Sequence, residues 1–122
     1  MEIGLTYTAS VFVTETNTAR AMGSGDLPVF ATPALVALME NAAMHAVAGF
    51  LSEGETTVGA AIDVAHVKPT AMGEAVRATA ELVAVDGRRL TFSLRAEDAH
   101  GEVGHGTHVR YVVNTERFMS KL

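Results

Sequence analysis

Apolar and polar residues alternate along several segments of this chain, which is the pattern of half-buried β-strands. Between residues 75 and 85 the apolar positions share one face, and the charged or hydroxyl positions share the other. The same alternation runs through residues 90–97, and Asp86-Gly87 between the two segments is a hairpin signal. The pattern predicts strands at 57–67, 75–85, 90–97 and 103–114, and a less regular first strand at 4–13.

One long helix is predicted between the first strand and the others. It begins at Thr32, a favourable N-cap residue, and Pro33 follows in the first turn. Ala, Leu and Met then dominate to about Ala48, and Gly49 is expected at the C′ position. This element order predicts an α+β domain with a single antiparallel sheet and one long helix packed on it.

The helix is unusually apolar. Between Ala34 and Ala48 only Glu40, Asn41 and His45 are polar. A helix that is apolar on nearly every side is normally buried on every side, and one sheet covers only part of it. We therefore expect a second copy of the chain to cover the rest, in a homodimer or a larger assembly.

Composition removes several classes of function. The 122 residues include 9 Lys and Arg against 14 Asp and Glu, a net charge of −5 that argues against binding nucleic acid or anionic lipid. There is no cysteine, so disulfides, thiolate nucleophiles and cysteine-bound zinc are excluded. No histidine spacing indicates a metal, and no apolar run is long enough for a membrane span. The expectation is a cytoplasmic protein without a metal.

Three residues stand out as candidates for chemistry. Glu40 lies among apolar neighbours, where a carboxylate is costly unless paired, and such groups cluster at functional sites. Alternatively, Glu40 faces solvent or pairs with a basic residue across an interface. His66 ends the strand after the helix, a common position for site residues, although a lone histidine there is more often a surface residue. The hydroxyl of Thr32 is explained as a helix cap, and eight helical residues separate it from Glu40 by about 12 Å.

Other polar or flexible positions give weaker signals. Gly101, Gly104 and Gly106 lie in a strand pattern, where they indicate a bulge or a close approach of another backbone instead of a phosphate loop. The segment 23–25 could form a mobile lid or an ordinary loop. The remaining histidines are weak candidates, namely His45, His100, His105 and His108.

The run from Phe30 to Glu40 resembles the central helix of hot dog fold acyl-CoA thioesterases, in particular the fluoroacetyl-CoA thioesterase group. The likeness continues without gaps to about Val113, through residues 58–66, 86–90 and 104–110. It implies one hot dog domain over residues 1–122, with a five-stranded antiparallel sheet wrapped around the helix. It also implies hydrolysis of a small acyl-CoA ester, with no cofactor because CoA is part of the substrate.

The resemblance assigns roles to residues. The catalytic Thr, Glu and His of the family fall on Thr32, Glu40 and His66, and the spacings of 8 and 26 residues agree. The family's substrate-contacting glycine falls on Gly59. Glu40 would act as nucleophile or as base for a water. Because hot dog thioesterases form their sites at the dimer interface, Thr32 and Glu40 could cooperate from two chains. We also expect Phe30 and Arg110 to bind the substrate. The candidates for binding the phosphates of CoA are Lys68, Arg88, Arg89 and Arg110.

One segment departs from the family. The fluoroacetyl-specific enzyme has a phenylalanine-rich lid before the helix, whereas this chain has Gly23-Ser24-Gly25-Asp26-Leu27-Pro28, without an aromatic residue. The expected acyl group is therefore not fluoroacetyl. Two other functions stay open from the residues, namely an enoyl-thioester hydratase or dehydratase of the same fold and a non-catalytic acyl-CoA binding module.

Overall fold

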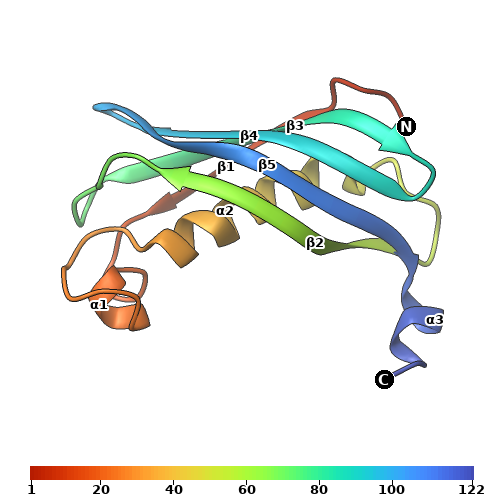
Figure 1. Cartoon of the computed structure of the whole chain (residues 1–122), viewed down its shortest axis with the longest axis horizontal. Coiled ribbons are helices and arrows are strands. Elements are labelled where there is room, and N and C mark those ends of the chain that lie inside the picture. The colour runs from red at the N-terminus through yellow and green to blue at the C-terminus, as the bar shows by residue number, and fades with distance from the viewer.

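The computed structural model, which describes residues 1–122, has one antiparallel sheet curled around a long helix (Figure 1). The strands are β1 (Thr6–Phe12), β2 (Glu55–His66), β3 (Ala75–Asp86), β4 (Arg89–Asp98) and β5 (Gly101–Asn114). The helices are α1 (Ala19–Met22), α2 (Thr32–Ala48) and α3 (Thr115–Met119). The strand order is β1-β3-β4-β5-β2, so β1 and β2 form the two edges. The predicted architecture is confirmed.

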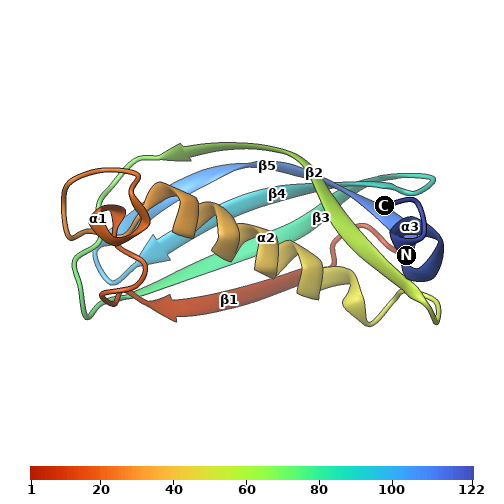
Figure 2. The ribbon, with the colours of Figure 1, turned by 90° about the horizontal axis from the view of Figure 1, so that it is seen from below.

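The core lies between α2 and the concave face of the sheet (Figure 2). The inward positions predicted from the alternation are buried, among them Val76 and Leu82 on β3 and Phe92 on β4. From α2, Leu35 and Met39 complete the same core. The predicted hairpin joins β3 to β4, where Asp86 pairs with Arg89 and Gly87 takes a φ of 59° that suits glycine. This packing fixes one face of α2 against the sheet.

Three local predictions differ from the structure. The N-cap of α2 is Ala31, without a side-chain cap, and Thr32 is the first helical residue. Gly49 is the C-cap in a right-handed conformation with φ of −75°, not a left-handed C′ residue. The short helices α1 and α3 were not predicted, because four or five residues are too few to show a helical period.

Two of the strand glycines allow β5 to approach β2 closely. A Cβ on Gly106 would lie 2.0 Å from the carbonyl oxygen of Asp63, and a Cβ on Gly104 would lie 2.7 Å from that of Ala65. The predicted close approach of another backbone is therefore confirmed at these positions.

A bulge in β2 decides which of its side chains face α2. Gly59 pairs with Arg110 and Ala61 with Val109, so Ala60 is an extra residue without a partner. In a regular strand, positions 59 and 66 would point to opposite faces because they are an odd number of residues apart. The extra residue restores the parity, and Gly59 and His66 both face the helix. No helix of the structure is long and apolar enough to cross a membrane.

Candidate active site

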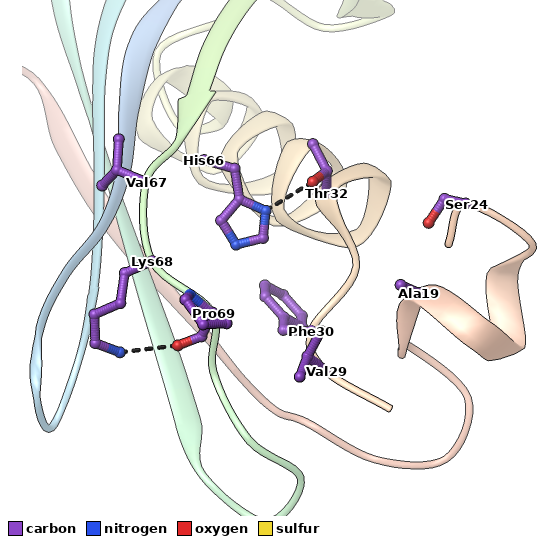
Figure 3. Close-up of a pocket in the computed structure, with 9 residues that line it drawn as sticks. All are labelled: Ala19, Ser24, Val29, Phe30, Thr32, His66, Val67, Lys68 and Pro69. Atoms are coloured by element: carbon purple, nitrogen blue, oxygen red, sulfur yellow. Dashed lines mark hydrogen bonds between the residues drawn. The ribbon is translucent and has the colours of Figure 1, made fainter. Parts of the chain in front are cut away.

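The first group of predicted residues lies where the start of α2 meets the end of β2 (Figure 3). The Thr32 Oγ1 and His66 Nδ1 atoms are 2.7 Å apart, a short hydrogen bond between the two side chains. They border a cavity of about 280 Å³ together with Phe30, Ser24 and Lys68. The structure thus brings Thr32, His66 and Phe30 together, and the Thr32 hydroxyl binds the histidine where a helix cap was expected.

The imidazole of His66 is only partly satisfied. Its Nε2 is buried and has no hydrogen-bond partner in the protein. Burial lowers the pKa of His66, and the nearby backbone of Lys68 acts in the opposite direction. The ring is therefore neutral at pH 7. A buried ring nitrogen without a partner, beside an open cavity, can exchange a proton with a bound substrate or water.

A buried carboxylate holds the walls of this cavity. Asp98 accepts hydrogen bonds from the Thr70 hydroxyl at 2.7 Å and the His100 backbone N–H at 2.8 Å, and it forms an ion pair with Lys68. Burial alone would raise the pKa of Asp98, but these hydrogen bonds hold the pKa at about 2. The carbonyl of Thr70 in turn accepts from the Phe30 backbone N–H at 3.0 Å. Asp98 therefore fixes the connection after β2 to the segment that leads into Thr32.

The second group surrounds Glu40 in the middle of α2. The Glu40 Oε2 atom lies 3.7 Å from the Arg110 Nη1 atom, and the Glu40 side chain is 41% exposed while that of Arg110 is 7% exposed. A Cβ on Gly59 would lie 2.7 Å from the same Glu40 oxygen. Position 59 thus has room for a side chain only if Glu40 moves. The structure brings Glu40, Gly59 and Arg110 together.

Arg110 is fixed by neutral partners. Its Nε donates to the Thr57 hydroxyl at 2.9 Å and its Nη2 to the Thr57 carbonyl at 2.9 Å. Its Nη1 lies 3.2 Å from Nε2 of His108, whose Nδ1 is 2.7 Å from the Ala61 carbonyl oxygen. His108 must therefore carry its proton on Nδ1 and accept from the guanidinium. Burial lowers the pKa of His108 and of Arg110, so His108 is neutral, while Arg110, which titrates far above neutral pH, keeps its charge.

The two groups do not meet within one chain. Along α2, Glu40 lies about 12 Å from Thr32, and along β2, Gly59 lies roughly 20 Å from His66. Neither Glu40 nor Gly59 borders the cavity beside His66. One chain therefore carries two partial sites, both on the helix side of the sheet.

Three residues of these groups were missed or undervalued from the sequence. From the sequence His108 is a weak candidate, although it stands two residues before Arg110 on a strand and so shares its face. Thr57 and Asp98 carry no sequence signal, because their partners lie far away in the chain. Of the other histidines, His45 binds the Asn41 carbonyl at 2.9 Å. The basic residues that were expected to bind the phosphates of CoA do not lie together. Lys68 borders the first cavity, whereas Arg88 lies at the far end of the sheet, 3.2 Å from Glu55.

A long helix wrapped by a curled antiparallel sheet is the architecture of the hot dog thioesterase superfamily. A thioesterase superfamily member from Thermus thermophilus has the same fold, with a TM-score of 0.91, 25% identity and coverage of 98% of this chain and 89% of that one. A hot-dog-like protein from Thermanaerovibrio acidaminovorans gives a TM-score of 0.90 at 27% identity, over 99% and 90% of the two chains.

The family within this superfamily is also defined. The model of the fluoroacetyl-CoA-specific thioesterase family matches residues 13–116. A fluoroacetyl-CoA thioesterase from Streptantibioticus cattleyicolor is 46% identical over 94 residues, which are 77% of this chain and 68% of that protein. A solved fluoroacetyl-CoA thioesterase structure gives a TM-score of 0.92 at 39% identity, over 99% of this chain and 94% of that one. The chain therefore belongs to the fluoroacetyl-CoA-specific thioesterase family and is an acyl-CoA thioesterase.

Proposed function

We propose that this protein hydrolyses a small acyl-CoA ester at a site that two copies of the chain form together. The observation that carries the proposal is the separation of the two partial sites. Glu40 of α2 and Gly59 of β2 meet near the middle of β2, and Thr32 and His66 meet at its end. Each group lacks what the other supplies, since a carboxylate base needs a proton shuttle and the histidine needs a group that attacks the ester.

An antiparallel pairing of β2 with β2 of a second copy would join the two groups. β2 is an edge strand of 12 residues that pairs only with β5, so its other edge is free. A two-fold axis near residue 62 places His66 of one copy opposite Gly59 of the other. Small residues along this edge, such as Ala60, Ala61 and Ala65, leave room for the approach. A homodimer of this kind would contain two equivalent sites.

Within such a site Glu40 starts the reaction. As a base it would take a proton from water, so that the hydroxide adds to the thioester carbonyl carbon. As a nucleophile it would add directly and form an anhydride, which water then opens. In both routes the Gly59 N–H stabilises the oxyanion on the former carbonyl oxygen. The close approach of Gly59 to Glu40 supports this placement, because a larger residue would displace the carboxylate.

The Thr32–His66 pair serves the leaving group. When the C–S bond breaks, CoA departs as a thiolate and takes up a proton to become the free thiol. The unpartnered Nε2 of His66 is buried beside the cavity in which this sulfur would lie, since His66 lines that cavity. The Thr32 hydroxyl holds the ring through Nδ1 and so fixes the direction of Nε2. The overall reaction consumes one water and releases the carboxylic acid and CoA.

The acyl group is a small one that needs no aromatic lid. Ser24 borders the first cavity from the segment before α2, and no residue between 23 and 28 is aromatic. The cavity is therefore more open and more polar on that side than a phenylalanine lid would make it. We infer that the protein does not select fluoroacetyl-CoA over other small acyl-CoA esters.

The test is hydrolysis of a panel of short, branched and aryl acyl-CoA esters, followed by the absorbance of a thiol reagent. Glu40→Gln and His66→Ala are compared with the wild type, and Glu53→Gln in an exposed loop is the matched control. We expect one ester class to turn over and Glu40→Gln to reduce kcat by about 10²–10⁴-fold without unfolding. No thiol release from any ester, or hydration of an enoyl-CoA without thiol release, would refute the proposal.

A further inference from the structure

A separate cavity of about 200 Å³ lies at the end of the sheet where β5 passes into α3. Three basic residues border this cavity, namely Arg88, Arg117 and Lys121, and no acidic residue does. They are 3 of the 9 basic residues in a chain with 14 acidic ones. A hollow with this local excess of positive charge, on an acidic protein, favours an anionic ligand.

Two of the three cations are free to bind such a ligand. The charged groups of Arg117 and Lys121 form no ion pair. Arg88 lies 3.2 Å from Glu55 and donates to the Val112 carbonyl at 3.2 Å, so its guanidinium is held at the rim. Glu55 is thereby engaged already. The other nearby acid, Glu116, is exposed and does not line the cavity.

The cavity also has an aromatic wall on a fixed support. Phe118 borders it and is 38% exposed. The turn into α3 is held by the Asn114 side chain, which accepts from the Arg117 backbone N–H at 2.9 Å, and by the Thr115 N–H, which donates to the Gly54 carbonyl at 2.9 Å. Guanidinium and ammonium groups bind phosphates, and an exposed aromatic ring stacks on a nucleobase. We propose that this cavity binds the 3′-phosphorylated ADP portion of CoA.

In the dimer of the proposed function, on which this inference rests, the cavity lies where the nucleotide of CoA could reach it. α1 and α3 lie on the helix side of the sheet at opposite ends of α2 (Figures 1 and 2). The two-fold axis near residue 62 therefore brings the α3 end of one copy beside the α1 end of the other.

The sheet register gives the distance from the reaction centre. Val112 and Val113, which border the cavity, pair with Thr57 and Thr56 near the start of β2. The cavity of one copy thus lies two strand spacings, roughly 10 Å, from the β2 strand that carries His66 in the other. The pantetheine arm of CoA would cross this gap, with the thioester at His66 and the nucleotide at Arg117.

The experiment compares substrates with and without the nucleotide. Steady-state kinetics are measured on an acyl-CoA ester and on the matching acyl-pantetheine, with the wild type and Arg117→Ala/Lys121→Ala. We expect the double variant to raise KM for acyl-CoA about tenfold or more, with kcat unchanged and KM for acyl-pantetheine at the wild-type value. The control is Arg77→Ala/Arg95→Ala, which removes the same charge from the outer face of β3 and β4.

A second measurement does not depend on turnover. Adenosine 3′,5′-bisphosphate is titrated into the wild type and the two double variants by calorimetry. We expect heat of binding that disappears in the Arg117/Lys121 variant and persists in the control. Binding without hydrolysis of any thioester would refute the proposed function and leave this inference standing. Equal KM changes for both substrates, or no binding of the bisphosphate, would overturn the inference. An effect of the double variant that is seen only with an acyl-carrier-protein substrate would overturn it as well.

Discussion

The two partial sites of this chain are built in opposite ways. Beside Glu40, each nitrogen of the Arg110 guanidinium is held by Thr57 or His108. Around His66 there is one side-chain hydrogen bond, to Thr32, and a buried Nε2 with none. The first arrangement fixes a charge, whereas the second leaves a group ready to bind or exchange a proton. The difference indicates that the Glu40 group contributes more to stability, whereas proton transfer to the leaving group falls to His66.

The largest effect is expected when the Glu40 and His66 substitutions are placed on different chains of one dimer. A heterodimer purified through two affinity tags contains one Glu40→Gln chain and one His66→Ala chain. If each site takes Glu40 and His66 from different copies, one of the two sites is intact and kcat per dimer is about half the wild-type value. Either homodimer of single variants is expected to be nearly inactive.

The reciprocal heterodimer is the control. It pairs a wild-type chain with a chain that carries both Glu40→Gln and His66→Ala. In a shared site both sites of this dimer are broken, whereas a site within one chain would leave one intact. Half activity here and none in the first heterodimer would contradict the composite site.

The next prediction compares a variant that should mainly lose stability with one that should mainly lose activity. Arg110→Ala leaves Thr57 and His108 without their buried donor, and we expect it to lower the free energy of unfolding by about 2–4 kcal/mol. Thr32→Val removes an exposed hydroxyl and should cost about 1 kcal/mol or less. Thr32→Val should nevertheless reduce kcat about 10–100-fold, because His66 loses the partner that directs its ring. Urea denaturation and kinetics measure both, and equal losses of stability in the two variants would refute the contrast.

A smaller effect is expected from Asp98, which positions the open partial site. Asp98→Asn removes the ion pair with Lys68 while keeping an acceptor for Thr70, so we expect a loss of about 1–3 kcal/mol and a fall of several-fold in kcat. The pKa of Asp98 is lowered from 3.8 to about 2 in the folded protein. Its contribution to stability is therefore complete above pH 3.8 and is lost as the pH falls toward 2. Acid denaturation should show this loss in the wild type and not in Asp98→Asn.

Much of the fold followed from the sequence, and the site followed only in part. The alternation of residues 75–97 placed the core of β3 and β4, and the register of the resemblance selected Thr32, Glu40 and His66. The cap assigned to Thr32 was wrong because Ala31 is the N-cap, and the Thr32 hydroxyl binds a distant histidine instead. The bulge at Ala60 was not visible either, since no residue type requires it. It nonetheless decides that Gly59 and His66 share a face, which shows that strand parity read from sequence fails wherever one residue is left unpaired.

The smallest expected effect lies in the pH dependence near neutrality, and it distinguishes the two histidines. Burial lowers the pKa of both His66 and His108 below the ordinary 6.5. The unfolded chain therefore takes up protons first on acidification, so stability should fall as the pH drops below about 6.5. Only His66 borders the cavity beside Thr32, and its protonated ring is the form that gives a proton to the leaving thiolate, so kcat should rise as the pH falls through the same range. In His108→Asn the stability curve should flatten while this pH dependence of kcat stays. If the pH dependence of kcat moves instead, the titration that governs kcat belongs to the Glu40 group and the division between the two partial sites is wrong.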